Sequence, residues 1–154
     1  MGMRPLAAVW VVLVAATGCA RGPAPAPHGE TTMVASPSAS AIALQPNDRG
    51  YVRIEVPSTS VDCSITAELV ACQRFSGVWH DENGQVRHTV SITTGGEFHW
   101  VNADLGELQG RVALGFHTYA AQGWTIVAGP DETRFVDGHS GHGMTVDTAH
   151  VTPF

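Results

Sequence analysis

The sequence predicts an all-β domain, built as a small antiparallel sandwich or a partly open barrel, which follows a leader and a linker. The clearest observation is that Val52, Ile54 and Val56 alternate with polar residues, which is the period of a half-buried strand. Short β-rich runs punctuated by Gly, Asn and Asp continue to the C-terminus. No long stretch has the helical period, so we expect mainly strands in the folded domain.

Charge argues against two kinds of partner. The chain of 154 residues has a formal net charge of −6, with 8 basic residues, all of them arginine, against 14 acidic ones. The arginines are scattered and form no basic patch, which argues against binding to nucleic acid. An acidic surface is not attracted to anionic lipid either, so membrane association has to come from an anchor.

Residues 1–18 are predicted to be a signal peptide. Arg4 precedes an uncharged apolar run from Leu6 to Ala16. As a helix this run would rise about 16 Å, roughly half of a hydrocarbon core of ~30 Å. It is too short to span a membrane but suits the apolar region of a secretory signal.

The run Ala15-Ala16-Thr17-Gly18-Cys19 resembles the lipobox of bacterial lipoproteins, in which small residues precede an obligatory cysteine. The resemblance implies that Cys19 receives a diacylglycerol, becomes the N-terminus after cleavage and carries acyl chains such as palmitate. Two or more chains anchor stably, since each buried CH₂ contributes ~0.8 kcal/mol. We therefore expect the protein at the outer face of the cell membrane, with no cofactor beyond these chains. The alternative is an ordinary secretory leader that contains a cysteine.

Residues 19–45 are predicted to be a flexible linker, and residues 46–154 the extracytoplasmic β domain. Pro23, Pro25 and Pro27 alternate with small residues, and residues 33–43 are rich in Ser and Ala. Such a segment has too little apolar bulk to offset the entropy lost on ordering. Proline extends a chain, so the linker should hold the domain away from the lipid surface.

Cys63 and Cys72 are predicted to form a disulfide. If the chain reverses around Ala67-Glu68, with a loop of two or four residues, the two cysteines face each other on adjacent strands. Residues in such positions have Cα atoms about 4.5 to 5.5 Å apart, which a disulfide can bridge. An oxidising compartment favours the bond. The alternative is two free buried cysteines.

A three-stranded meander is predicted over residues 74–80, 86–93 and 97–101. A two-residue turn at Asn83-Gly84 would place Trp79 opposite His88 and Phe75 opposite Ile92. A three-residue loop at 94–96, with a glycine in the left-handed position, would place Ile92 opposite Phe98. The inner face would then carry six residues: Phe75, Trp79, Val90, Ile92, Phe98 and Trp100.

Four further strands are predicted near the C-terminus, at 111–116, 123–128, 133–136 and 143–147, and one helical turn is predicted at 105–108. Period-two patterns and intervening turn residues indicate the strands. Their expected contributions to the core are Trp124, Ile126, Met144 and Val146.

Three segments resemble small secreted or lipid-anchored proteins of unknown function from actinobacteria, including mycobacteria: Cys63-Ser-Ile-Thr, Val70-Ala-Cys72 and the Gly-rich run from Gly138 to Met144. The resemblance spans about residues 58–154. It implies an extracytoplasmic location and a cysteine-paired domain, but no activity. Such relatives often have a second cysteine pair near the C-terminus, which this chain lacks.

His139 and His142, with Asp137 nearby, are the strongest candidates for metal ligands. Imidazole and carboxylate groups suit zinc, but the spacing is not that of a helical zinc motif. The alternative is a polar Gly-rich loop. Ser140 does not match the pattern of a nucleophile elbow, so we assign no catalytic residue.

The expected function is non-catalytic binding of an envelope protein, a glycan or a lipid. The sequence has no recognisable nucleophile–base pair, phosphate loop or redox CxxC motif. The alternative function is a metal-dependent envelope hydrolase that uses His139, His142 and Asp137.

Overall fold

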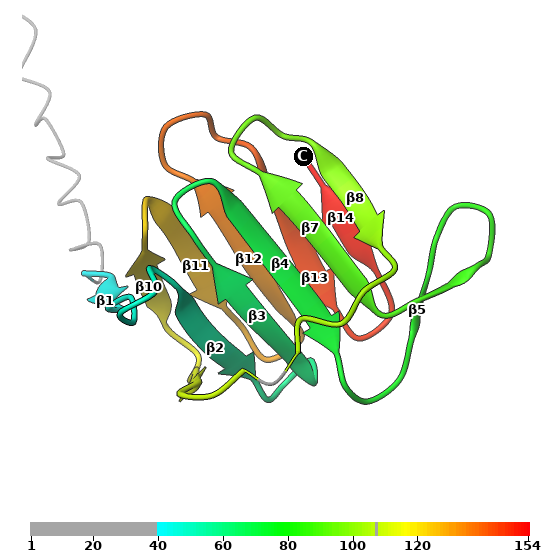
Figure 1. Ribbon diagram of the computed structural model, residues 1–154, viewed down its shortest axis with the longest axis horizontal. Coiled ribbons are helices and arrows are strands. Elements are labelled where there is room, and N and C mark those ends of the chain that lie inside the picture. Colours follow the sequence, from blue (N-terminus) through cyan, green and yellow to red (C-terminus); the bar gives the residue numbers. More distant parts are fainter. Residues whose placement is uncertain (1–39, 107) are drawn as a thin grey trace, which may run out of the picture. The chain divides into compact units, whose positions relative to one another are not determined.

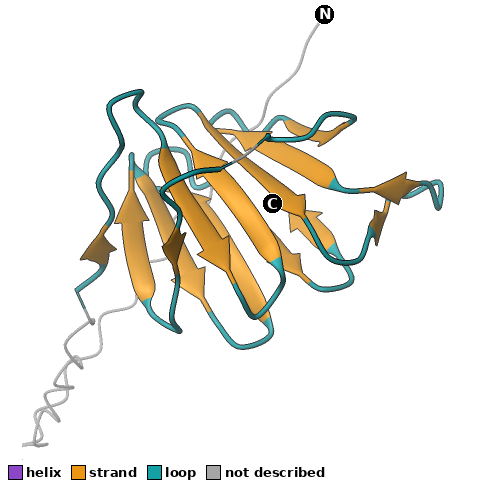
Figure 2. Ribbon diagram, turned by 60° about the horizontal axis from the view of Figure 1, so that its bottom comes forward, coloured by secondary structure: helices purple, strands orange, loops and turns teal. Residues whose placement is uncertain are grey.

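The computed structural model describes residues 40–106 and 108–154 of the protein. These residues form an all-β sandwich without a helix, in which two six-stranded sheets lie face to face beside a small separate hairpin (Figures 1 and 2). The predicted fold class is thereby confirmed. No helix in these two ranges is long and apolar enough to cross a membrane. The predicted signal peptide and Cys19 lie outside the described residues.

The first sheet, sheet A, begins with the strand nearest the N-terminus and is otherwise made of C-terminal strands. Its order is β1 (Ile42–Ala43), β10 (Thr118–Ala121), β11 (Trp124–Ala128), β12 (Glu132–Asp137), β13 (Gly143–Asp147) and β14 (Val151–Pro153). Strand β1 pairs parallel to β10, and the other neighbours are antiparallel. The β structure therefore starts a few residues before the boundary predicted at Pro46.

The second sheet, sheet B, is built mainly from the middle of the chain. Its order is β8 (Phe98–Val101), β7 (Thr89–Thr93), β4 (Leu69–Arg74), β3 (Val61–Ile65), β2 (Val52–Val56) and β9 (Val112–Ala113). Only β2 and β9 pair parallel in this sheet. Strands β5 (Trp79–His80) and β6 (Val86–Arg87) form the separate hairpin.

Inward-facing apolar side chains of both sheets fill the core. Val52, Ile54 and Val56 are each at most 2% exposed, so the alternation in the sequence marks the buried face of β2. The predicted core residues of the C-terminal strands are also buried: Trp124, Ile126, Met144 and Val146.

Two buried tryptophans join sheet A to sheet B and to the β5–β6 hairpin by hydrogen bonds as well as by packing. The indole N–H of Trp124, in sheet A, donates to the carbonyl of Thr66 at the end of β3 (3.0 Å). The indole N–H of Trp79 donates to the carbonyl of Asp147 in β13 (3.0 Å). Each buried indole thus has the partner that its N–H requires.

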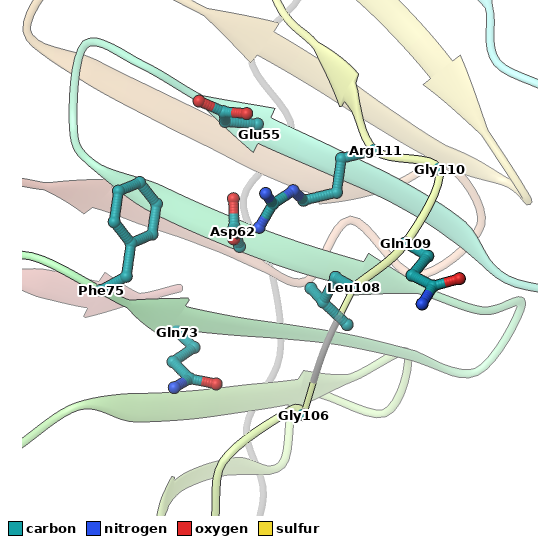
Figure 3. A pocket seen from close by; sticks show the side chains of 9 residues that line it. All are labelled: Glu55, Asp62, Gln73, Phe75, Gly106, Leu108, Gln109, Gly110 and Arg111. Atoms are coloured by element: carbon teal, nitrogen blue, oxygen red, sulfur yellow. Dashed lines mark hydrogen bonds and ion pairs between the residues drawn. The ribbon is translucent and has the colours of Figure 1, made fainter.

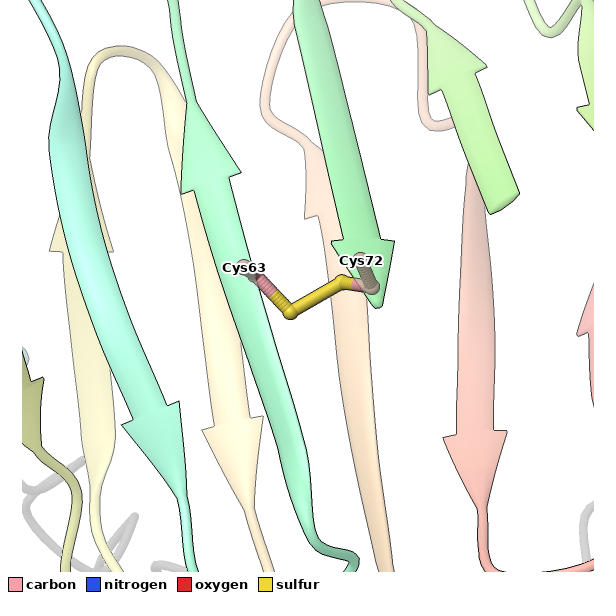
Figure 4. Close-up of a disulfide and its surroundings, with 2 residues drawn as sticks. All are labelled: Cys63 and Cys72. Atoms are coloured by element: carbon pink, nitrogen blue, oxygen red, sulfur yellow. A yellow bond between two sulfur atoms is a disulfide. The ribbon is translucent and has the colours of Figure 1, made fainter. Parts of the chain in front are cut away.

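The Cys63–Cys72 disulfide is present and joins neighbouring strands β3 and β4, with the Cα atoms 4.1 Å apart (Figure 4). Thr66 N–H donates to Leu69 O, so these two residues form a hydrogen-bonded pair. Hydrogen-bonded and non-hydrogen-bonded pairs alternate along an antiparallel ladder, and the cysteines lie three pairs further along. The cysteines therefore occupy a non-hydrogen-bonded pair, where opposite residues lie closest. The Thr66 hydroxyl stabilises the reversal by accepting the N–H groups of Glu68 and Leu69.

The hairpin between β7 and β8 also has the predicted register. Ile92 faces Phe98 and Val90 faces Trp100. The loop spans residues 94–96, and Gly96 has a φ of 84°, in the left-handed region. Phe98 and Trp100 pack against the core from the edge of the sheet.

The predicted register of the β5–β6 hairpin is wrong by one residue. Trp79 faces Arg87, not His88, because the loop has three residues, 82–84, instead of two. Gly84 is the left-handed residue at the end of this loop, with a φ of 73°. The Asp81 carboxylate accepts the N–H groups of Asn83 and Gln85, which stabilises the longer loop.

The prediction that Phe75 faces Ile92 in the core is also wrong. Strand β7 pairs with β4, so that Val70 faces Ile92. Residues 75–78 leave the sheet instead of pairing with β7, and Phe75 is 59% exposed. The prediction paired each strand with the one joined to it by the nearest turn, and so it placed residues 74–80 beside β7. In the structure β4 occupies that edge of β7.

The remaining predictions from the C-terminal half differ in detail. Strands β11, β12 and β13 are confirmed, but the strand predicted at 111–116 is limited to Val112–Ala113. The helical turn predicted at 105–108 is not formed, since Gly106 has a φ of 71°, which a right-handed helix excludes. Strands β1, β10 and β14 were not predicted from the sequence pattern.

Removing the disulfide should destabilise the sandwich without changing its fold. In the chain-entropy model a bridge that closes so short a loop contributes about 2 to 3 kcal/mol. We expect the double variant Cys63→Ala/Cys72→Ala to have a free energy of unfolding that is lower by that amount. Its urea midpoint should therefore be lower, while the slope of the free energy against urea concentration stays the same. An unchanged midpoint would contradict a stabilising role for the bond, and oxidised and reduced wild-type protein give the matched comparison.

Candidate functional site

The outer face of sheet B is crossed by the connection between β8 and β9, whose described residues, 102–106 and 108–111, we call the strap. The two strands lie at opposite edges of the sheet, with β7, β4, β3 and β2 between them, so the connecting chain has to cross the sheet (Figure 1). Leu108 is only 5% exposed, which shows that the strap packs onto this face. The strap therefore covers polar residues that would otherwise face solvent.

Side-chain hydrogen bonds fasten the first half of the strap. The Gln73 amide, on β4, accepts the Leu105 N–H (2.6 Å) and donates to the Asp104 carboxylate (3.2 Å). Arg87 donates to the side-chain oxygen of Asn102 (2.6 Å). These contacts fix the strap to both β4 and the β5–β6 hairpin.

A row of polar residues runs across the outer face beneath the strap. In the strand register Glu55 faces Asp62, Asp62 faces Gln73, and Gln73 faces Thr89. Neighbouring strands are about 4.8 Å apart, so the two carboxyl groups start from adjacent backbone positions. Like charges placed directly opposite are unfavourable, so this pair needs compensation from another group.

Arg111, at the end of the strap, supplies that compensation. Its guanidinium forms an ion pair with one carboxylate oxygen of Asp62. The Arg111 side chain remains 40% exposed, whereas that of Asp62 is 10% exposed. Figure 3 shows Arg111 reaching down from the strap toward Asp62, with Glu55 on the neighbouring strand.

Between the strap and the sheet lies a cleft of about 570 Å³, which we call the strap cleft. Asp62, Glu55 and Gln73 form its polar floor, and Phe75 stands at one side (Figure 3). The remaining wall comes from the strap itself, and consists of Gly106, Leu108, Gln109, Gly110 and Arg111. The volume lies within the range usual for small-ligand sites.

Asp62 is the electrostatically unusual group of this cleft. Burial raises its pKa, Arg111 opposes that rise, and the nearby Glu55 carboxylate adds to it. The second carboxylate oxygen, Oδ1, is buried and has no hydrogen-bond partner among the described residues. A buried acceptor without a donor is costly, so this oxygen marks a place where a further donor would stabilise the structure.

The residues predicted to bind metal lie elsewhere, in the loop between β12 and β13. Asp137 Oδ1 accepts the N–H groups of His139 (3.2 Å) and Ser140 (2.7 Å), so the carboxylate shapes the loop. Hydrogen bonds from Ser140, first from its backbone and then from its side chain, lower the Asp137 pKa. Within the two described ranges, no three His, Cys, Asp or Glu side chains are grouped to hold a metal ion.

His142 and Ser140 take part in local packing. A Cβ added to Gly96 would lie 2.8 Å from the His142 ring, so this ring covers the β7–β8 loop. The Ser140 hydroxyl accepts the His142 N–H (3.2 Å). This arrangement matches the alternative of a polar Gly-rich loop.

Sequence reasoning did not identify the strap cleft. Two of its floor residues, Glu55 and Asp62, stand between buried neighbours, and that alternation places them on the outer face. Their grouping depends on the order of the strands and on the path of the strap. Both are set by long-range pairing, which a local pattern does not contain.

Comparison with protein-family models, with curated proteins and with solved structures finds no match for this chain.

The raised pKa of Asp62 predicts a pH effect of definite sign. A carboxyl whose folded pKa lies above its unfolded value, about 3.9, favours folding at acidic pH. That contribution is lost as the pH rises through the folded pKa. We expect Asp62→Asn, which stays neutral, to gain stability over the wild type as the pH increases from about 4 toward neutrality. Urea titrations over a pH series measure this difference.

Asp81→Asn provides a control of opposite sign. Hydrogen bonds to the Asp81 carboxylate, first from the Gln85 backbone N–H, lower the Asp81 pKa. Its stabilising contribution is present above the unfolded pKa and is lost as the pH falls through the folded one. The Asp81→Asn variant should therefore be less stable than the wild type near neutrality and approach it in acid. Identical pH profiles for the two variants would contradict the assignment.

Proposed function

We propose that the protein is a lipid-anchored, non-catalytic binding module on the extracytoplasmic face of a bacterial cell membrane. In this proposal Cys19 carries the lipid, the following segment is the tether, and the β-sandwich presents the strap cleft to an envelope component. The strap cleft is the observation that carries the binding part of the proposal.

Cysteine usage supports the anchor. The chain has 3 cysteines, and two of them, Cys63 and Cys72, form the disulfide. Cys19 is then the one cysteine outside that bond, and it stands directly after small residues and an apolar run. A disulfide in the core of the domain also suits an oxidising compartment outside the cytoplasm.

The composition of the strap cleft supports binding. It combines a largely buried carboxylate, an exposed cationic group and an exposed aromatic ring within one concavity on the rigid face of a sheet. Binding sites typically place a few polar groups beside apolar surface in this way. A tether of lipid and linker would keep such a site at high local concentration near its partner, so high intrinsic affinity is not required.

The alternative of a metal-dependent hydrolase at His139 and His142 gains no support from the loop geometry. The Asp137 oxygen that would serve as a ligand already accepts two backbone N–H groups. The His142 ring covers Gly96, so its position has a structural explanation. We therefore favour binding over catalysis.

Lipidation at Cys19 can be tested by metabolic labelling in the native host. A fatty-acid analogue should label the wild-type protein, whereas Cys19→Ser should remain unlabelled, because the serine hydroxyl is not a substrate for thiol lipidation. Cys63→Ser serves as the matched control and should still be labelled. Equal labelling of wild type and Cys19→Ser, or an unlabelled and secreted wild type, would overturn the anchor.

Binding at the strap cleft can be tested in the same cells by photo-crosslinking. A benzoylphenylalanine residue at position 75 stands at the cleft, and we expect it to capture an envelope component. The matched position is Phe116, which is 63% exposed and lies outside the cleft lining. Absence of an adduct at position 75, or the same adduct at both positions, would contradict a binding role for the cleft.

A further inference from the structure

We propose that the strap cleft binds a pyranose ring of an envelope glycan. Asp62 and Arg111 would hydrogen-bond neighbouring hydroxyl groups, Glu55 would accept a further one, and Phe75 would stack on the apolar face of the ring. This inference rests on the proposed binding function and names the chemical class of the ligand.

The polar groups of the cleft offer acceptors and a donor side by side. Asp62 and Glu55 present carboxylate oxygens from paired positions on β3 and β2. Arg111 carries five N–H donors and pairs with Asp62 through only one of its nitrogens. A hydroxyl group both donates and accepts, so adjacent ring hydroxyls match a carboxylate and a guanidinium at the same time.

The unpaired oxygen of Asp62 gives this match an energetic basis. Asp62 Oδ1 is buried and has no donor among the described residues, and the residue as a whole is 7% exposed. Arg111 pairs with the other oxygen, Oδ2, through a side chain that is itself 40% exposed, so its long stem can shift while that ion pair is kept. A hydroxyl entering beside the guanidinium would supply the missing hydrogen bond, so binding would remove a cost that the free protein carries.

Phe75 provides the apolar surface that a sugar ring needs. Its side chain stands at the edge of the cleft and is 59% exposed, although it extends from the end of β4 directly beside the polar floor (Figure 3). A pyranose has C–H groups on its faces and hydroxyls around its rim. The ring could therefore cover Phe75 while its hydroxyls reach the floor, which buries aromatic surface without leaving polar groups unpaired.

The charges of the cleft disfavour the other simple ligand classes. An anion would meet the Glu55 and Asp62 carboxylates, and a cation at Asp62 would have to displace the Arg111 guanidinium that already pairs with it. A purely apolar ligand would bury these groups without partners, which is costly. A neutral ligand rich in hydroxyl groups avoids all three penalties.

The test is a sugar titration of the full chain in detergent micelles, followed by amide NMR. The probes are glucose, galactose, mannose and N-acetylglucosamine, together with the pooled neutral monosaccharides released from the host envelope. Sorbitol is the control probe, since it offers hydroxyls without a ring face. We expect saturable shifts with at least one cyclic probe at Phe75, Gly106, Gly110 and Arg111, and none with sorbitol.

Matched variants connect these shifts to the cleft. Phe75→Ala should weaken binding by about tenfold or more, which corresponds to about 1.4 kcal/mol. Phe75→Tyr should retain binding, because it keeps the ring. Asp62→Asn should also weaken binding, since it replaces a carboxylate acceptor. Phe116→Ala removes an equally exposed phenylalanine elsewhere and should leave the affinity unchanged.

Failure of this inference is distinct from failure of the proposed function. If no cyclic probe gives saturable shifts, or if Phe75→Ala binds as the wild type does, the glycan assignment is overturned. A protein or lipid adduct captured from position 75, together with absent sugar binding, would retain the binding module but exclude a glycan as its ligand. An unlabelled Cys19 would overturn the anchor alone, since sugar binding does not depend on it.

Discussion

The placement of β8 and β9 at opposite edges of one sheet is the constraint that produces the candidate site. Six strands spaced about 4.8 Å apart give a sheet about 24 Å wide, and the strap has to cross that width. An extended residue advances about 3.3 Å and a helical residue 1.5 Å, so an extended chain crosses this width with fewer residues than a helix. The strap consequently crosses the outer face of the sheet and forms one wall of the cleft.

The two faces of sheet B follow different physical rules. The inner face is closed by aliphatic residues, the disulfide and the two hydrogen-bonded tryptophans, and it makes a rigid platform. The outer face carries a polar row that is covered only in part, and Asp62 Oδ1 there has no hydrogen-bond partner in the part of the chain that the structure describes. The inner face therefore supplies most of the packing that stabilises the sheet. The outer face can then carry polar groups to which a ligand can hydrogen-bond.

Local patterns predicted two of the three local registers that we derived from the sequence, and they missed the β5–β6 register by one residue because the loop is longer than expected. The Cys63–Cys72 pairing and the β7–β8 register could be predicted from the sequence, because a tight reversal fixes both partners within a few residues. The position of Phe75 was missed because it depends on β4 pairing with β7 across an intervening hairpin. The strap cleft depends on still more distant pairings, so its residues could be assigned to a face of the sheet but not to a common site.

The entry of the chain into the sandwich has a mechanical consequence. The first strand, β1, pairs with β10 through only two residue pairs at the edge of sheet A. A force applied through the N-terminal segment would load this short strand before any strand of the disulfide-bonded sheet. Detaching β1 would lengthen the N-terminal segment by about 3.3 Å for each released residue and would leave the core of the sandwich intact. The domain thus has a compliant first element that can absorb tension.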